Sequence, residues 1–344
     1  MLDLFPARSI GPFGRRVKHA RGGRIPVTVV TGFLGAGKTT LVRRFLTTPE
    51  GAGTAVVVNE FGAVGIDDAL IRASTDETVL LGNGCLCCTA RSDLQVALRG
   101  LVFDRERGNV PFFRRVIIET SGLADPGPVL QTFATDRALG GEFHLELSVA
   151  LVDAVNGLAT LNWSAEARKQ VILADRLIVT KTDLAEAAVV EQVLARLRAL
   201  NSRAPTETAV NGAIDPTNLT EPPSSLAPAM ARGFVAEAEH SDGIVSFVLT
   251  QDDPMEWTPF ARAMDTLTSL RGPDLLRVKG FVEIAGCKGP VLVQFVQHLA
   301  DPPVELHDWP AGERRTRLVF ITRNLPEAAV RVLFGAVRAV AGSN

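Results

Sequence analysis

The feature that most constrains this chain is the glycine-rich stretch Thr31-Gly32-Phe33-Leu34-Gly35-Ala36-Gly37-Lys38-Thr39-Thr40. It follows an apolar, largely β-branched run at residues 25–30 and precedes an amphipathic pattern at residues 41–46. A strand, a glycine turn and a helix in this order are the context that a phosphate-binding P-loop requires. The glycines allow backbone N–H groups to turn inward, and the helix N-terminus directs its partial positive charge at the anion. The pattern predicts binding of a nucleoside triphosphate.

Particular side chains of this loop have expected contacts. Lys38 would reach the β- and γ-phosphates, and the Thr39 hydroxyl would ligate Mg²⁺. The expected nucleotide-binding residues of the loop are Gly32, Gly35, Ala36, Gly37, Lys38, Thr39 and Thr40.

Strand and helix patterns alternate downstream of the loop. Helical patterns at residues 92–102, 165–173 and 186–200 alternate with buried-strand patterns at residues 54–58, 78–81, 115–118, 147–153, 176–179 and 206–210. Such alternation predicts an α/β fold with a doubly wound, mainly parallel sheet of the P-loop GTPase type. We expect this domain to span residues 25–211.

The regular pattern stops after Asn211, where prolines and Ser/Thr residues predict a linker over residues 212–240. A second, smaller α+β domain is expected over residues 241–344, from four strand patterns and two helical ones. Residues 1–24 are rich in Arg and Lys, with Asp3 as the single acid. They predict a disordered basic extension, with an anion-binding arm as the alternative.

The composition gives no reason to expect nucleic-acid or membrane partners. The formal net charge of −2 gives no general attraction to nucleic acid or to a membrane surface. No apolar run approaches the roughly 20 residues that span a bilayer. We therefore expect a cytoplasmic protein with neither nucleic-acid nor membrane partners.

Two acidic segments follow predicted strands. The loop after the strand at residues 54–58 contains Asn59, Glu60 and Asp67, where a nucleotide-sensing switch is expected. The strand at residues 115–118 ends at Glu119, as in a Walker B segment, whose carboxylate lies near Mg²⁺ through water. Glu119, together with Lys38 and Thr39, is the expected catalytic set.

Thr180-Lys181-Thr182-Asp183 lies at a strand end well downstream of the P-loop. The Asp183 carboxylate can accept hydrogen bonds from the N1–H and amino group of guanine, and adenine offers no such pair of donors. The Lys181 stem can lie along the base. The motif predicts a preference for GTP; the alternatives are an exposed polar turn and a small-molecule kinase that uses ATP.

Three of the four cysteines lie in the turn Cys85-Leu86-Cys87-Cys88. Three thiolates supply most of a tetrahedral site for Zn²⁺ or another thiophilic divalent ion. The fourth ligand stays open between water, Glu60, a histidine (His240 is the best placed) and a partner's group. The spacing of Cys85 and Cys88 also fits a thiol redox pair, and buried structural cysteines are a third alternative. The isolated Cys287 is expected to be a core or surface thiol.

These motifs together resemble the CobW-type metallochaperone GTPases. The resemblance rests on Gly32–Thr40, Asn59–Gly62, Gly84–Cys88, Glu119–Gly122 and Thr180–Asp183, and in the second domain on 240–244, 276–280 and 317–321. It implies GTP hydrolysis with Mg²⁺, Zn²⁺ or Co²⁺ held at the cysteine turn, and delivery to a client protein that docks on the C-terminal domain. A homodimer is left open.

Two departures from the family pattern bear on this expectation. Thr180 replaces the usual Asn at the start of the guanine motif, and the linker carries no histidine-rich run. The second departure predicts a single delivery site and not a metal store. From the order of the motifs, we expect GTP and Mg²⁺ to order the 59–68 loop and so shape the metal site, and hydrolysis to loosen it.

Overall fold

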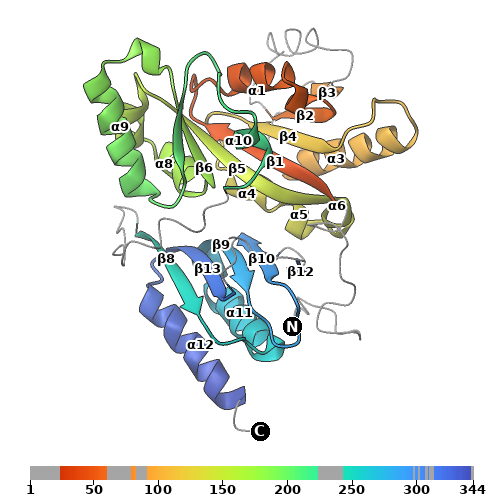
Figure 1. Cartoon of the computed structure of the whole chain (residues 1–344), viewed down its shortest axis with the longest axis vertical. Helices are drawn as coiled ribbons and strands as arrows, with labels where there is room; N and C mark the ends of the chain where they lie inside the picture. The colour runs from red at the N-terminus through yellow and green to blue at the C-terminus, as the bar shows by residue number, and fades with distance from the viewer. Residues whose placement is uncertain are drawn as a thin grey trace. The chain divides into compact units, whose positions relative to one another are not determined.

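The computed structural model describes residues 24–59, 79–82, 91–223, 243–296, 299–300, 303–306, 309 and 314–341. The chain divides into two compact units, Ile25–Ala229 and a second unit that begins at Met230 (Figure 1). No helix among the described residues has the length and apolar character needed to cross a membrane.

The first unit is built on a seven-stranded parallel sheet with the strand order β3-β2-β4-β1-β5-β6-β7. Its strands are β1 (Ile25–Gly32), β2 (Thr54–Asn59), β3 (Val79–Gly82), β4 (Arg115–Thr120), β5 (Phe143–Asp153), β6 (Arg176–Thr180) and β7 (Thr206–Ala209). The predicted parallel α/β sheet is confirmed. Because β1 lies between β4 and β5, the loops that follow these three strands meet at one edge of the sheet.

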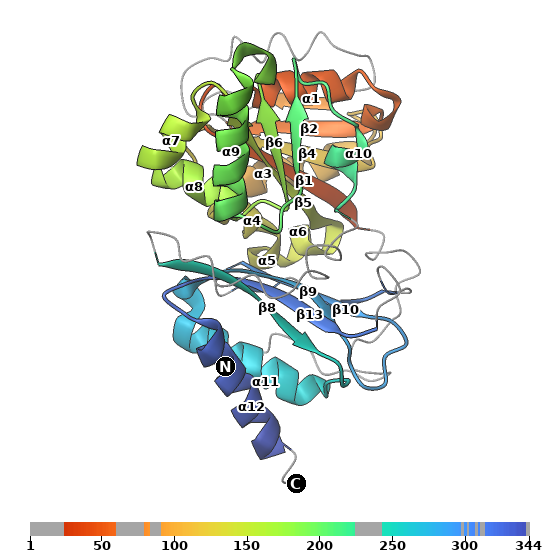
Figure 2. The same cartoon turned by 60° about the vertical axis from the view of Figure 1, so that its left-hand side comes forward.

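Helices flank this sheet (Figures 1 and 2). They are α1 (Lys38–Leu46), α3 (Arg91–Glu106), α4 (Gly127–Leu130), α5 (Thr132–Thr135), α6 (Arg137–Glu142), α7 (Gly157–Trp163), α8 (Ala165–Ile172), α9 (Ala187–Leu200) and α10 (Thr217–Thr220). The sequence predicted α1, α3, α8 and α9. It missed the helices of four to seven residues, because so few turns carry no periodic apolar stripe.

The core beneath the P-loop helix joins α1 to the centre of the sheet. Leu41, Val42 and Phe45 of α1 are buried against Val30 and Ile178, within one apolar cluster. The i, i+1, i+4 spacing of the three helix residues places them on one face, which fixes the helix that begins at Lys38.

Residues 212–223 belong to the first unit, although the sequence placed them in the linker. Leu219 of α10 is fully buried, and its carbonyl accepts a hydrogen bond of 2.8 Å from Thr28 Oγ1. The Arg176 guanidinium also binds the Asn218 side chain. Prolines and Ser/Thr residues here interrupt regular structure without preventing packing.

The second unit carries a six-stranded antiparallel sheet ordered β11-β10-β9-β13-β8, with β12 paired to β10. Its helices are α11 (Trp257–Arg271) and α12 (Glu327–Ala341). Its strands are β8 (Ile244–Gln251), β9 (Leu275–Val282), β10 (Val291–Val296), β11 (Leu299–Ala300), β12 (Val304–Glu305) and β13 (Thr316–Arg323). The predicted α+β class is confirmed.

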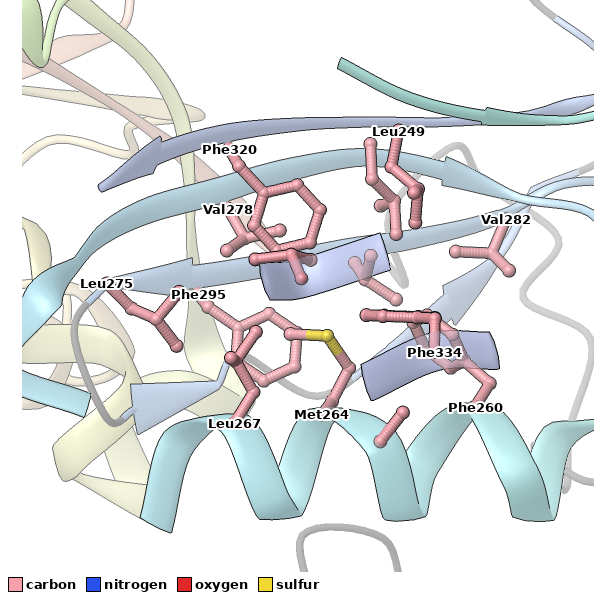
Figure 3. Close-up of a cluster of buried hydrophobic side chains, with 14 of the residues drawn as sticks. Leu249, Phe260, Met264, Leu267, Leu275, Val278, Val282, Phe295, Phe320 and Phe334 are labelled. Atoms are coloured by element: carbon pink, nitrogen blue, oxygen red, sulfur yellow. The ribbon is translucent and has the colours of Figure 1, made fainter. Parts of the chain in front are cut away.

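Both helices of this unit lie on the same side of its sheet (Figure 2). The core between them and the strands is rich in phenylalanine, as Figure 3 shows. Phe247 and Phe320 stack with ring centroids 5.2 Å apart, and Phe260 and Phe334 of the two helices lie 6.1 Å apart. This core depends on period-2 strands and amphipathic helices, which local patterns predict well.

Candidate functional site

The P-loop leaves the sheet at Gly32, where close packing excludes any side chain. Gly32 has φ 140°, and a Cβ there would lie 2.4 Å from the carbonyl oxygen of Leu151. Gly37, with φ 88°, is the cap residue from which α1 starts. Both conformations favour glycine, so the glycine spacing of the loop is a requirement of its backbone.

The Lys38 side chain folds back over the loop. Its Nζ donates hydrogen bonds to the carbonyl oxygens of Gly32, at 3.0 Å, and Phe33, at 3.2 Å, and the side chain is buried. The ammonium group therefore lies in the concavity of the P-loop, where the sequence predicted a phosphate-binding lysine.

Thr39, in the first turn of α1, meets Glu119 near the end of β4. Thr39 Oγ1 donates a hydrogen bond of 2.6 Å to Glu119 Oε1, and Glu119 is 1% exposed. A hydroxyl and a buried carboxylate supply the hard oxygen donors that Mg²⁺ prefers, and the hydroxyl oxygen keeps lone pairs while donating its proton. The residues present therefore fit a magnesium ion. Next to them, Thr120 Oγ1 donates to Thr31 Oγ1 at 2.9 Å, which ties the two strand ends together.

The loop that follows Glu119 lies against the P-loop. A Cβ at Gly122 would be 2.6 Å from the backbone nitrogen of Leu34 and 2.8 Å from its Cα. Only glycine permits this approach of the two backbones.

The motif at residues 180–183 is attached to the P-loop through its first residue. Thr180 Oγ1 donates a hydrogen bond of 2.8 Å to the carbonyl oxygen of Ala36. The threonine that departs from the family pattern therefore holds the end of β6 against the P-loop. Asp183 is exposed, in the 3₁₀ turn Thr182–Leu184.

Lys181 is held by an acid that the sequence did not single out. Lys181, with φ 56°, places its Nζ 2.6 Å from Asp153 Oδ2. Burial pushes the pKa of Asp153 upward, but hydrogen bonds from Lys181, the Val155 N–H and Asn156 outweigh it and lower that pKa. The available signal was an acid at the end of the predicted strand 147–153: Asp153 pairs with Thr180 across β5 and β6.

Several predicted site residues lie outside the described residues, namely Glu60, Asp67, Cys85, Cys87, Cys88 and His240. Asn59 ends β2, where its backbone pairs with Thr120. Within the part of the chain that the structure describes, no group of three or more His, Cys, Asp or Glu residues could hold a metal ion. The cysteine site stays a prediction. Cys287 packs against the core of the second unit, as expected for a structural thiol.

Comparison with known families agrees with both units. Residues 26–207 match the CobW/HypB/UreG nucleotide-binding domain, and residues 244–338 match the cobalamin synthesis protein cobW C-terminal domain. The chain belongs to the CobW family. The resemblance drawn from the motifs is therefore confirmed, and with it the expected pairing of a P-loop domain and a CobW C-terminal domain.

The E. coli relative of this CobW family member matches nearly its whole length. It is 39% identical to the zinc chaperone YjiA of Escherichia coli over 91% of this chain and 99% of that protein. The zinc-bound crystal structure of E. coli YjiA GTPase superposes with a TM-score of 0.63 at 35% identity, covering 92% of this chain and 99% of that one. The zinc-regulated GTPase metalloprotein activator 1 of Schizosaccharomyces pombe is 37% identical over 51% of this chain and 44% of that protein.

Proposed function

We propose that this CobW protein couples GTP hydrolysis to the delivery of zinc to a client protein. The chain is a GTPase of the metallochaperone type: its relatives are named zinc chaperones and zinc-regulated GTPase activators of metalloproteins. The metal site, its coupling to the nucleotide and the docking of a client on the second unit are the finer parts of the proposal.

The nucleotide half rests on the grouping of Lys38, Thr39 and Glu119. On binding GTP, Lys38 would exchange the carbonyls of Gly32 and Phe33 for the β- and γ-phosphate oxygens, a stronger charge-assisted contact. Thr39 Oγ1 and the Glu119 carboxylate would hold Mg²⁺, Glu119 through water. Bound Mg²⁺ neutralises charge on the transferred phosphoryl group. Glu119 orients the Thr39 hydroxyl before the ion arrives.

Selection of guanine is assigned to Asp183. The carboxylate is exposed at the carboxyl edge of the sheet, and the Lys181–Asp153 ion pair holds the residue two positions before it. The pair fixes the direction in which the 3₁₀ turn leaves β6. Asp183 is thereby free to accept hydrogen bonds from a base bound over the Lys181 stem.

The sheet register carries the proposed coupling between nucleotide and metal. Val58 of β2 pairs with Glu119 of β4 on one side and with Gly82 of β3 on the other. Two strand spacings separate Gly82 from Glu119, which is about 10 Å. The cysteine turn starts three residues after Gly82, and the predicted switch loop of residues 59–68 starts at Asn59, the last residue of β2. Both loops therefore leave the same edge of the sheet as Glu119.

This neighbourhood supports a metal site that senses Mg²⁺ and the terminal phosphate. Cys85, Cys87 and Cys88 would bind Zn²⁺, with Glu60, His240, water or a partner's group as the fourth ligand; Co²⁺ is the alternative metal for the same thiolates. By linkage, any factor by which GTP changes zinc affinity is also the factor by which zinc changes GTP affinity.

Zinc titration of the reduced full-length protein tests this coupling. The zinc Kd is measured with Mg²⁺ plus GDP and with Mg²⁺ plus a non-hydrolysable GTP analogue, using a chromogenic chelator as competitor. We expect a difference of about fivefold or more between the two nucleotides, which is the lower end of typical allosteric coupling. The Cys85→Ser/Cys87→Ser/Cys88→Ser variant should lose stoichiometric zinc, and the Cys287→Ser control should keep it. Equal zinc affinities with both nucleotides would exclude the coupling, and a reduced wild type without bound zinc would favour the redox alternative.

A further inference from the structure

We propose that Gln170 and Lys169 of α8 are positioning residues that hold the loop 121–127 beside the P-loop, and that this loop must be held for the protein to distinguish GTP from GDP. The inference rests on the proposed nucleotide site and goes beyond it, because α8 lies outside the motifs that define that site.

Gln170 makes the first attachment. Its side chain is 1% exposed, and its Nε2 donates hydrogen bonds of 3.1 Å to the carbonyl oxygens of both Gly122 and Ala124. Two carbonyl acceptors require an N–H donor, which settles the orientation of the amide. Each bond fixes one peptide plane, so one side chain sets the orientation of two peptides in the loop.

Lys169 makes the second attachment. Its ammonium group forms an ion pair with Asp125, and Asp125 Oδ1 accepts a hydrogen bond of 2.8 Å from the Gly127 N–H. Gln170 and Lys169 are adjacent in α8, and their partners are spread along the loop. The helix thus holds the loop at three of its residues.

The held loop is the one that faces the phosphate site. Its Gly122 backbone abuts Leu34, and the residues just before it carry the Thr39–Glu119 and Thr31–Thr120 hydrogen bonds. A segment that contacts the P-loop immediately after the magnesium carboxylate lies where a terminal phosphate would add a new contact. GDP lacks that phosphate, so freeing the loop should cost GTP more affinity than GDP.

The surroundings of Gln170 allow a clean substitution. Gln170 and Leu34 line the same pocket. Gln170 Oε1 has no hydrogen-bond partner among the described residues. A methionine of nearly the same shape removes the two donated bonds without disturbing another polar partner of the side chain.

Gln170→Met, Lys169→Met and a control, Asn201→Leu, test the inference in the full-length protein. Asn201 is also a buried amide, and its Nδ2 donates to the carbonyls of Val171, Ile172 and Ala174 at the end of the same helix. It has no hydrogen bond with the loop. Its Oδ1 also accepts a bond from the Ala204 N–H, so the control should cost at least as much stability as Gln170→Met without releasing the loop.

The readouts are the Kd values of fluorescent GDP and of a fluorescent non-hydrolysable GTP analogue, with kcat and KM for GTP from phosphate release. Gln170→Met should weaken the analogue about 30-fold and GDP less than twofold, since two hydrogen bonds are lost and each is worth about 1 kcal/mol. Hydrolysis should slow in kcat as well. Lys169→Met should act in the same direction, about threefold. Its ion pair with Asp125 is partly exposed, so this variant is less at risk of failing to fold.

The inference would be overturned if both α8 variants kept the ratio of analogue Kd to GDP Kd within twofold of wild type. It would also be overturned if Asn201→Leu changed this ratio as much as the α8 variants do. If Gln170→Met does not fold, Lys169→Met decides alone. Lys38→Ala separates this inference from the proposed site: it should lose both nucleotides. Normal nucleotide binding by Lys38→Ala would refute the proposed site itself. If Lys38→Ala loses nucleotide binding but Gln170→Met keeps the wild-type ratio of analogue Kd to GDP Kd, only the role of α8 is refuted.

Discussion

The contact between Gly122 and Leu34 predicts a large catalytic effect from one added methyl group. In Gly122→Ala, the Cβ would lie 2.6 Å from the Leu34 nitrogen and 2.8 Å from its Cα and Cδ2. Real Cβ atoms almost never approach this closely. Two of the three contacts are to backbone, so a rotamer change of Leu34 cannot relieve them.

The size of the effect follows from these distances. Ordinary contact begins at 3.4 Å, so the two backbones must separate by about 0.8 Å. The two Gln170 hydrogen bonds are 3.1 Å long, and a donor–acceptor distance beyond about 3.5 Å no longer counts as a hydrogen bond. A shift of this size is enough to break both, at a cost of about 2 kcal/mol for the held loop, or roughly 30-fold in affinity for a ligand that needs it.

Phosphate-release kinetics and nucleotide titration measure this effect. Gly122→Ala should reduce kcat/KM for GTP by about 30-fold or more while the GDP Kd changes less than threefold. Gly100→Ala is the matched control: a Cβ at this position in α3 meets nothing within 4 Å. It should leave nucleotide binding unchanged and stabilise the helix by up to about 1 kcal/mol.

One result would refute this reasoning. If Gly122→Ala hydrolyses GTP at the wild-type rate and keeps the wild-type ratio of GTP to GDP affinity, the loop does not need close contact with the P-loop. An equal loss of GTP and GDP affinity would also contradict it, because the loop would then contribute to folding and not to recognition of the terminal phosphate.

Two further predictions concern charged groups of the first unit. Asp183→Asn should weaken GTP binding about 10- to 100-fold and leave ATP binding unchanged, because the new amide presents an N–H donor to the donors of guanine. Competition of ATP and GTP against a fluorescent nucleotide measures both affinities. An unchanged preference for GTP would exclude the assignment of guanine recognition to Asp183. Asp136 is buried, which raises its pKa, but hydrogen bonds from the N–H groups of Leu139 and Ala138 and from Arg99 outweigh burial and lower it. Because the folded-state pKa lies below the unfolded value of about 3.9, the stabilisation is complete above that pH and is lost as pH falls through the folded value. Urea unfolding should show Asp136→Asn less stable than wild type at pH 6, with a smaller deficit at pH 3; an equal deficit at both would contradict the assignment.

Local requirements of the backbone made much of the fold predictable. The P-loop needs glycine at position 32, because a side chain there would clash with Leu151. The glycine spacing of the loop is therefore visible in the sequence. Apolar runs of period two and 3.6 predict strands and long helices for the same reason, since each pattern depends on neighbours a few residues away. Helices as short as α10 lack that signal, and the sequence accordingly placed this segment in a linker.

The candidate site was predictable in its motifs and not in its supports. Lys38, Thr39 and Glu119 were each predicted by type and position, and the structure joins Thr39 to Glu119 by a hydrogen bond and places Lys38 over the P-loop. Asp153 and Gln170 were missed, because nothing near them in the chain indicates a partner. Lys181 and Asp153 are 28 residues apart, and Gln170 and Gly122 are 48 residues apart.

The sequence by itself predicted a P-loop, an acid that ends a neighbouring strand, a guanine-type motif and a cysteine cluster, because each is a short pattern with its own chemistry. Only the tertiary structure decided that Thr180, 144 residues from Ala36, holds the P-loop, and that α8 holds the loop after Glu119. These contacts depend on the strand order, which places β4 and β5 beside β1 and β6 beside β5. Strand order is set by the packing of the whole sheet, and no local period records it.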